Sequence, residues 1–201
     1  MPSLLPRQLL SINVAQASPI EIEGRQIMTG IRKRAVSTLA DPQRIAVRAL
    51  GLQGDEQADM TVHGGLNKAV YAYPHEHYDF WQTVRAQASA QPWGEAMPHG
   101  MLGENLTLTG LLEGDVHVGD VLQFPDCALA VSEPRRPCYK FQAVMGFKHA
   151  VKMMAQSGYC GFYLTVRRPG TLAAGEHYEL IPGAREVRIA ELFKARMLRS
   201  D

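Results

Sequence analysis

Short β-rich stretches recur along the whole chain, and this recurrence restricts its fold more than any other feature of the sequence. Turns with glycine and aspartate separate them, as at Glu113-Gly114-Asp115. The stretches cover residues 9–15, 34–38, 44–50, 69–73, 105–109, 116–124, 128–133, 161–167 and 177–181. Many short, evenly spaced strands are typical of barrels and sandwiches, so the sequence predicts a mostly β fold.

Three segments carry a helical pattern instead. The first runs from Pro74, a residue suited to a first helical turn, to about residue 90. The second covers about 139–156, and a short one closes the chain at about 186–199. No linker or repeat divides the 201 residues. We therefore expect one domain over residues 1–201, mostly β with peripheral helices, an α+β fold.

Composition and charge exclude several classes of protein. With 46% hydrophobic and 20% charged residues, the chain is neither disordered nor a coiled coil. A net charge of +1 creates no field that would attract nucleic acid, so no nucleic-acid partner is predicted. No run approaches the roughly 18 apolar residues that cross a bilayer, which predicts no membrane partner. Residues 9–17 imitate a signal peptide, but Ser11 and Asn13 interrupt them, so we expect a strand there and a cytoplasmic protein.

The cysteines differ in their sequence surroundings. Three cysteines, an odd number, argue against a disulfide framework and against a paired-cysteine zinc site. Cys127 alternates with apolar residues along a predicted strand and is expected to fill the core, and Cys160 has no cationic neighbour. Cys138 directly precedes a predicted helix and is flanked by Arg135, Arg136 and Lys140. A helix start and nearby cations both favour a thiolate, so Cys138 is the predicted reactive cysteine.

Two further polar segments lie at strand ends. In the first, Gly64 and Gly65 would let backbone N–H groups approach a ligand, and Lys68 would complete an anion site with His63 and Asn67 nearby. An ordinary wide turn explains the same residues, and chemistry alone favours that simpler interpretation. In the second segment, which contains Glu104 and Asn105, the amide could bind the edge of a heterocycle. A turn whose asparagine bonds its own backbone is the commoner explanation.

Together and in this order, the three segments resemble the MOSC domain, the module at the C-terminal end of molybdenum cofactor sulfurases. The resemblance rests on Gly54-Asp55 through His63-Gly64-Gly65 to Lys68-Ala69-Val70-Tyr71, on Gly103-Glu104-Asn105-Leu106, and on Pro134-Arg135 with Pro137-Cys138-Tyr139-Lys140. It covers roughly residues 5–185 and is strongest toward small stand-alone bacterial members of the YiiM type. Three ordered motifs are more specific than any one of them.

The resemblance implies a MOSC-type β-barrel that holds a pterin molybdenum cofactor in a cleft, with Cys138 as catalytic residue and metal ligand. It implies reduction of N-hydroxylated compounds, including hydroxylaminopurine bases, and, for the family as a whole, pyridoxal phosphate binding. A homodimer is one possible state, and the resemblance does not decide it, because the chain stops at Asp201 whereas these relatives usually carry a longer helical tail. The residues expected to hold the cofactor are His63, Gly64, Gly65, Asn67, Lys68, Glu104, Asn105, Arg135, Arg136 and Lys140.

The chain carries no flavin or iron–sulfur motif, so we expect a separate flavoprotein or other reductase to supply electrons. Three alternatives stay open. Cys138 could carry a persulfide as a sulfur-transfer centre, the domain could bind the cofactor without catalysing a reaction, or Cys138 and His63 could form a hydrolase. Metal analysis tests the molybdenum function, and sulfide release on reduction tests the persulfide.

Overall fold

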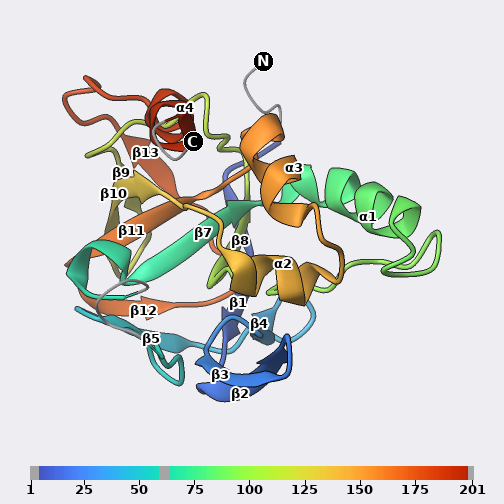
Figure 1. The fold of residues 1–201 in the computed structure, drawn as a ribbon. Coiled ribbons are helices and arrows are strands. Elements are labelled where there is room, and N and C mark those ends of the chain that lie inside the picture. The colour runs from blue at the N-terminus through green and yellow to red at the C-terminus, as the bar shows by residue number, and fades with distance from the viewer. Residues whose placement is uncertain (1–4, 59–63, 199–201) are drawn as a thin grey trace.

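The computed structural model describes residues 5–58 and 64–198, which form a large mixed sheet with helices packed outside it (Figure 1). The strand order is β13-β9-β10-β11-β7-β8-β1-β4. The bounds are β1 Gln8–Val14, β4 Arg34–Thr38, β7 Val70–Pro74, β8 Leu106–Thr109, β9 Val121–Gln123, β10 Ala128–Pro134, β11 Phe162–Arg168 and β13 Glu179–Ile181. The predicted mostly β fold with peripheral helices is confirmed.

The sheet bends round until its two ends almost meet. Its pairs are antiparallel except β7 with β8, which run parallel. The segment that leads into β13 bonds to the start of β1. There Leu9 N donates to Glu176 O over 2.9 Å, Gly175 N donates to Leu9 O over 2.7 Å, and Gln8 bridges His177. The expected barrel is therefore present in incompletely closed form, joined at one end by a short bridge.

Two smaller sheets lie beside this barrel. One is the hairpin of β2 (Ser18–Ile22) and β3 (Arg25–Thr29), and the other joins β12 (Gly170–Leu172), β5 (Ile45–Arg48) and β6 (Gly51–Leu52). The hairpin was not predicted. Its turn carries positive φ at Glu23 (51°) and Gly24 (75°), the backbone of a tight two-residue hairpin, but Glu-Gly is a weaker turn signal than Asn-Gly.

The helices cover one side of the sheet. A 3-10 turn, His75–His77, leads into α1 (Tyr78–Gln87), and α4 (Ile189–Leu198) lies near the end of the chain. The single helix predicted over about 139–156 is wrong. The structure has α2 (Tyr139–Met145) and α3 (Ala150–Ser157) instead, because Gly146 adopts the left-handed conformation at φ 77° and ends α2. None of the helices in the described ranges has the length and apolar character needed to span a membrane.

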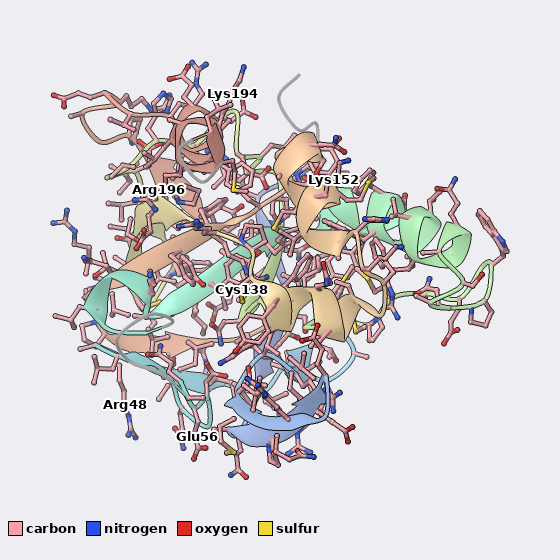
Figure 2. All side chains as sticks on the ribbon, in the orientation of Figure 1. Arg48, Glu56, Cys138, Lys152, Lys194 and Arg196 are labelled. Carbon is pink, nitrogen blue, oxygen red and sulfur yellow. The ribbon has the colours of Figure 1, made fainter. Side chains whose placement is uncertain are left out.

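Two apolar clusters hold these layers together. The first fills the barrel interior with side chains such as Leu9, Leu106 and Leu129, and the second lies between the sheet and the helices, with Trp81 and Phe141 fully buried. The start of α2 projects over the second cluster. Figure 2 shows that Cys138 lies near the middle of the molecule in this view, whereas Arg48 and Lys194 lie at its edges.

Candidate functional site

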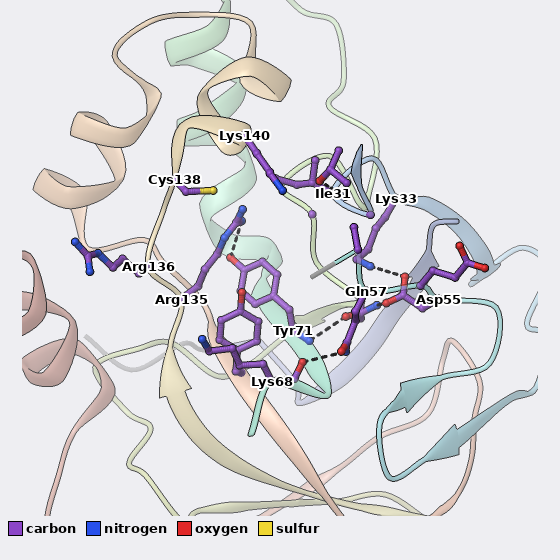
Figure 3. Close-up of a pocket in the computed structure, with 17 residues that line it drawn as sticks. Ile31, Lys33, Asp55, Gln57, Lys68, Tyr71, Arg135, Arg136, Cys138 and Lys140 are labelled. Carbon is purple, nitrogen blue, oxygen red and sulfur yellow. Dashed lines mark hydrogen bonds and ion pairs between the residues drawn. The ribbon is translucent and has the colours of Figure 1, made fainter. Parts of the chain in front are cut away.

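A cleft of about 680 Å³, counting the space open to solvent, lies between the β2–β3 hairpin, the loop after β6, the barrel wall and the start of α2 (Figure 3). Its described lining includes five cationic side chains and two carboxylates. The lining residues are Thr29, Gly30, Ile31, Lys33, Asp55, Glu56, Gln57, Ala58, Lys68, Tyr71, Gly103, Asn105, Arg135, Arg136, Cys138, Lys140 and Tyr163.

Cys138 lines this cleft from the N-cap position of α2. Its extended backbone (φ −136°, ψ 175°) connects the end of β10 to the helix, and its side chain is half-buried. The other two cysteines are fully buried, and none of the three forms a disulfide. Burial raises the pKa of Cys127 to about 12 and raises the pKa of Cys160 well above its ordinary value. Of the three thiols, Cys138 therefore has the surroundings expected of a ligand.

Arg135 forms the floor of the cleft beside that thiol. Only 5% of the residue is exposed, and its guanidinium lies 4.9 Å from the ring centroid of Tyr71 and 4.8 Å from that of Phe141. It donates hydrogen bonds to Leu102 O and to the Tyr71 hydroxyl. No carboxylate of the described residues forms an ion pair with it. Figure 3 shows the guanidinium and the Cys138 thiol projecting toward the same space. A buried cation without an anion is the signature of an anion site.

Lys33, Asp55 and Asn105 form a second polar group at the far wall. Lys33 Nζ and Asp55 Oδ1 form an ion pair with side chains only 8% and 4% exposed, and Asn105 Nδ2 donates to Asp55 Oδ2 over 2.8 Å. Burial lowers the pKa of Lys33, against the opposing effect of Asp55. Asn105 Oδ1 also accepts from Tyr71 N over 3.0 Å. This asparagine lines the cleft, but its amide already bonds to Tyr71 of β7, Asn13 of β1 and Asp55 of the loop after β6.

Lys33 is a cleft residue that sequence reasoning missed. It follows a hairpin that was not predicted, and no motif or spacing marks it. Gln57 was also missed. Its side chain accepts from Gly65 N over 3.2 Å and donates to Lys68 O over 3.3 Å, so it fastens the loop after β6 to the segment before β7.

Lys68, Arg136 and Lys140 all line the cleft. Lys68 extends from the short 3-10 helix Leu66–Lys68, with Nζ 4.0 Å from Glu133 Oε1. Lys140 Nζ donates to Met28 O over 3.2 Å, which ties α2 to the β2–β3 hairpin. Arg136 is exposed and, in Figure 3, projects away from the thiol at the rim. Lys68 and Lys140 are thus better placed than Arg136 to meet a ligand in the cleft.

Other predicted cofactor residues lie behind the cleft or beside it. Glu104 is fully buried and does not line it, because its carboxylate accepts from the Tyr78 hydroxyl, Gly100 N (2.7 Å) and Thr107 Oγ1 (2.9 Å). Burial raises the pKa of Glu104, opposed by these hydrogen bonds. Gly64, Gly65 and Asn67 do not line the cleft either, although Gly65 bonds to a lining residue. His63 lies outside the described residues.

Among the described residues, no three histidine, cysteine, aspartate or glutamate side chains gather as a metal site would require. Within the described residues, a metal in this cleft would have Cys138 as its candidate protein ligand. A pterin dithiolene cofactor supplies its own sulfur ligands and carries a phosphate. The thiol and the unpaired buried guanidinium fit such a group.

Comparison with known proteins decides the family. The model of the MOSC domain matches residues 59–179, more than half of the chain. This chain belongs to the MOSC domain family. The resemblance seen in its three motifs is confirmed. The MOSC protein YflK of Bacillus subtilis (strain 168), uncharacterized, is 37% identical over 175 residues, which are 86% of this chain and 72% of YflK.

Further MOSC relatives extend the likeness. The YiiM protein of Escherichia coli (strain K12) is 32% identical over 157 residues, 78% of this chain and 68% of that protein. A protein named reductase from Gibberella moniliformis (strain M3125 / FGSC 7600) is 34% identical over 134 residues, 66% of this chain but 23% of that protein. The crystal structure of YiiM from Geobacillus stearothermophilus superposes with a TM-score of 0.73 and 30% identity, covering 98% of this chain and 86% of that one.

Proposed function

We propose that this MOSC protein binds a pterin molybdenum cofactor in the cleft, with Cys138 as metal ligand, and reduces N-hydroxylated compounds such as N-hydroxylated purine bases. Membership of the MOSC family and a relative named reductase support an oxidoreductase. The substrate class comes from the likeness of the motifs to YiiM-type proteins. Cofactor binding requires a thiol ligand beside an anion site, and the cleft offers both.

One observation carries this proposal. Arg135 is almost fully buried, is held between two aromatic rings and has no ion pair with a described carboxylate, although it opens to the same cleft as Cys138. Leaving a guanidinium desolvated and unpaired costs several kcal/mol. An anionic group of a bound ligand would offset this desolvation cost of the guanidinium.

The residues would divide the work of holding the cofactor. Cys138 would ligate the metal, and Arg135, Lys140 and Lys68 would bind the phosphate, since guanidinium and ammonium groups are the usual phosphate partners. Lys33 contributes less charge because Asp55 already neutralises it. When bound, the cofactor supplies a two-electron redox centre. The protein's part is to orient the substrate in the cleft and to provide protons.

Electrons would come from a separate flavoprotein or other reductase. The chain carries no flavin or iron–sulfur motif, and nicotinamide alone delivers hydride rather than the electrons that a metal accepts. The shared region is only 23% of the fungal protein named reductase, so most of that protein has no counterpart here. A partner protein would supply what this chain lacks.

Metal and pterin content tests the proposal. Wild-type protein expressed in a host that makes the cofactor should carry molybdenum and pterin in equal amounts, close to one of each per chain. Cys138→Ser should lose most of the molybdenum, whereas Cys127→Ser, a buried thiol outside the cleft, should keep it. Wild-type protein without either component would refute the proposal.

The same preparation separates the alternatives. A protein without molybdenum that releases sulfide on reduction would indicate a persulfide carrier, which the half-buried Cys138 thiol also suits. A protein that holds the cofactor but reduces no N-hydroxylated compound with an artificial electron donor would be a binding module. The hydrolase alternative has the least support, because no feature of the sequence places a base beside the Cys138 thiol.

A further inference from the structure

The hydroxyl group of Tyr163, on β11, differs from those of the buried tyrosines. Tyr71, Tyr73, Tyr78 and Tyr178 each donate a hydrogen bond to an oxygen of the protein. The Tyr163 hydroxyl donates none within the described residues, and it is not among the unpartnered polar atoms that are sealed from solvent. Because the half-buried Tyr163 lines the cleft, its hydroxyl opens into the cleft.

The phenol is held firmly and keeps its proton. Its ring packs 5.2 Å from the ring of Tyr71, and the Lys68 ammonium lies 5.9 Å from its centroid on the cleft side. Burial raises the pKa of Tyr163 above its ordinary value, against the opposing effect of Arg135, so the phenol is neutral at neutral pH.

Several other polar groups of the cleft already have protein partners. The Lys33 ammonium is paired with Asp55, and the Lys140 ammonium bonds to Met28 O. The amide of Asn105 bonds to protein groups, and the hydroxyl of Tyr71 donates to Cys160 O over 2.8 Å. A guanidinium such as that of Arg135 does not give up a proton in a protein. Tyr163 is a neutral acid that lines the cleft and donates no hydrogen bond within the described residues.

We propose that the Tyr163 hydroxyl binds the N-hydroxyl oxygen of the substrate and donates the proton with which this oxygen leaves as water. The inference rests on the proposed function. In the reaction the N–O bond breaks, and two electrons from the reductase stay on nitrogen. The departing oxygen takes the phenol proton, nitrogen takes a second proton from solvent, and water returns a proton to the phenolate. A hydroxyl is a poor leaving group without such a proton.

The test compares Tyr163→Phe with Tyr159→Phe, which removes a hydroxyl from another half-buried tyrosine that does not line the cleft. Molybdenum content is measured first, and both variants should match the wild type. Calorimetry without reductant then compares an N-hydroxylated purine base with its amine. Tyr163→Phe should bind the N-hydroxylated base about tenfold more weakly and the amine unchanged, the loss of one hydrogen bond. Tyr159→Phe should bind both like the wild type.

Turnover with a reduced dye gives the second readout. Tyr163→Phe should slow reduction of the N-hydroxylated base about a hundredfold, but slow its O-acetylated form only severalfold, because acetate leaves without a proton. Equal slowing of both substrates, or unchanged affinity for the N-hydroxylated base, would overturn the role of Tyr163. Wild-type protein without molybdenum would defeat the proposed function itself, and that failure is seen before any variant is compared.

Discussion

Replacing Arg135 by methionine separates a residue that serves the ligand from one that serves the fold. The substitution removes the two aromatic contacts of the guanidinium, worth about 1 kcal/mol each. It also removes the hydrogen bonds to Leu102 O and Tyr71, worth about 3 kcal/mol together. Against this loss, methionine removes the desolvation cost of an unpaired buried charge, about 4 kcal/mol, and fills the slot between the rings. The net change in the free energy of unfolding should therefore be within about 2 kcal/mol of zero.

The assay measures urea unfolding of cofactor-free protein and pterin content of loaded protein. Arg135→Met should unfold near the wild-type midpoint and retain little pterin, and Arg135→Ala should unfold with about 2–5 kcal/mol less free energy than Arg135→Met because it leaves a cavity. Arg85→Met is the matched control, since Arg85 is also buried (8% exposed) but lies outside the cleft, and it should keep its pterin. If Arg135→Met lost more than about 4 kcal/mol and kept its pterin, the guanidinium would serve the fold and our reasoning would be wrong.

Four other outcomes are expected. Cys138→Ser should abolish reduction of N-hydroxylated bases, whereas Cys127→Ser should keep that activity and lose about 2 kcal/mol by urea unfolding, because it places a hydroxyl in a fully buried, apolar position. Burial and a neighbouring histidine lower the pKa of His99 to about 4, so the folded state binds fewer protons than the unfolded state between pH 6.5 and 4 and stability should fall as pH falls through that window. The loss, of order 2 kcal/mol after solvent screening, should disappear in His99→Gln when unfolding is measured at pH 7 and pH 4.5. Gly161→Ala should lower the thermal midpoint by several degrees or prevent folding, because its φ is 62° and a Cβ would lie 2.5 Å from Ala72 O. Loaded protein should not oxidise nicotinamide with an N-hydroxylated base unless a flavoprotein reductase is added, and robust turnover without it would contradict the predicted electron route.

The sequence predicted best the features that depend on local pattern. Strand alternation located the barrel strands, and a cysteine between cations and a helical stripe located the thiol at the start of α2. The second predicted helix was drawn too long because the apolar stripe continues past Gly146, while the left-handed backbone at that glycine ends the helix. Periodicity reports which face is buried, and it does not report a break between two helices that bury the same face.

The cleft itself was harder to predict, because it depends on which polar groups bond to each other across the fold. Glu104 and Asn105 look like ligand-binding residues in sequence, yet Glu104 accepts hydrogen bonds from its sequence neighbours and from Tyr78, and Asn105 donates to Asp55. Lys33 and Tyr163 carry no local signal, and only the packing of a hairpin and of β11 brings them to the cleft. Residue chemistry identifies candidates, and the partners that each one finds in three dimensions decide its role.

The short bridge between Gln8 and His177 also bears on how the protein is made. It joins β1 to the segment that leads into β13, so the barrel closes only after His177 has left the ribosome. β1 also ends beside the cleft, where Ala15 N donates to Asp55 over 2.9 Å. The residues that line the cleft run from Thr29 to Tyr163, so a ligand that needs the whole lining would bind only after Tyr163 has left the ribosome.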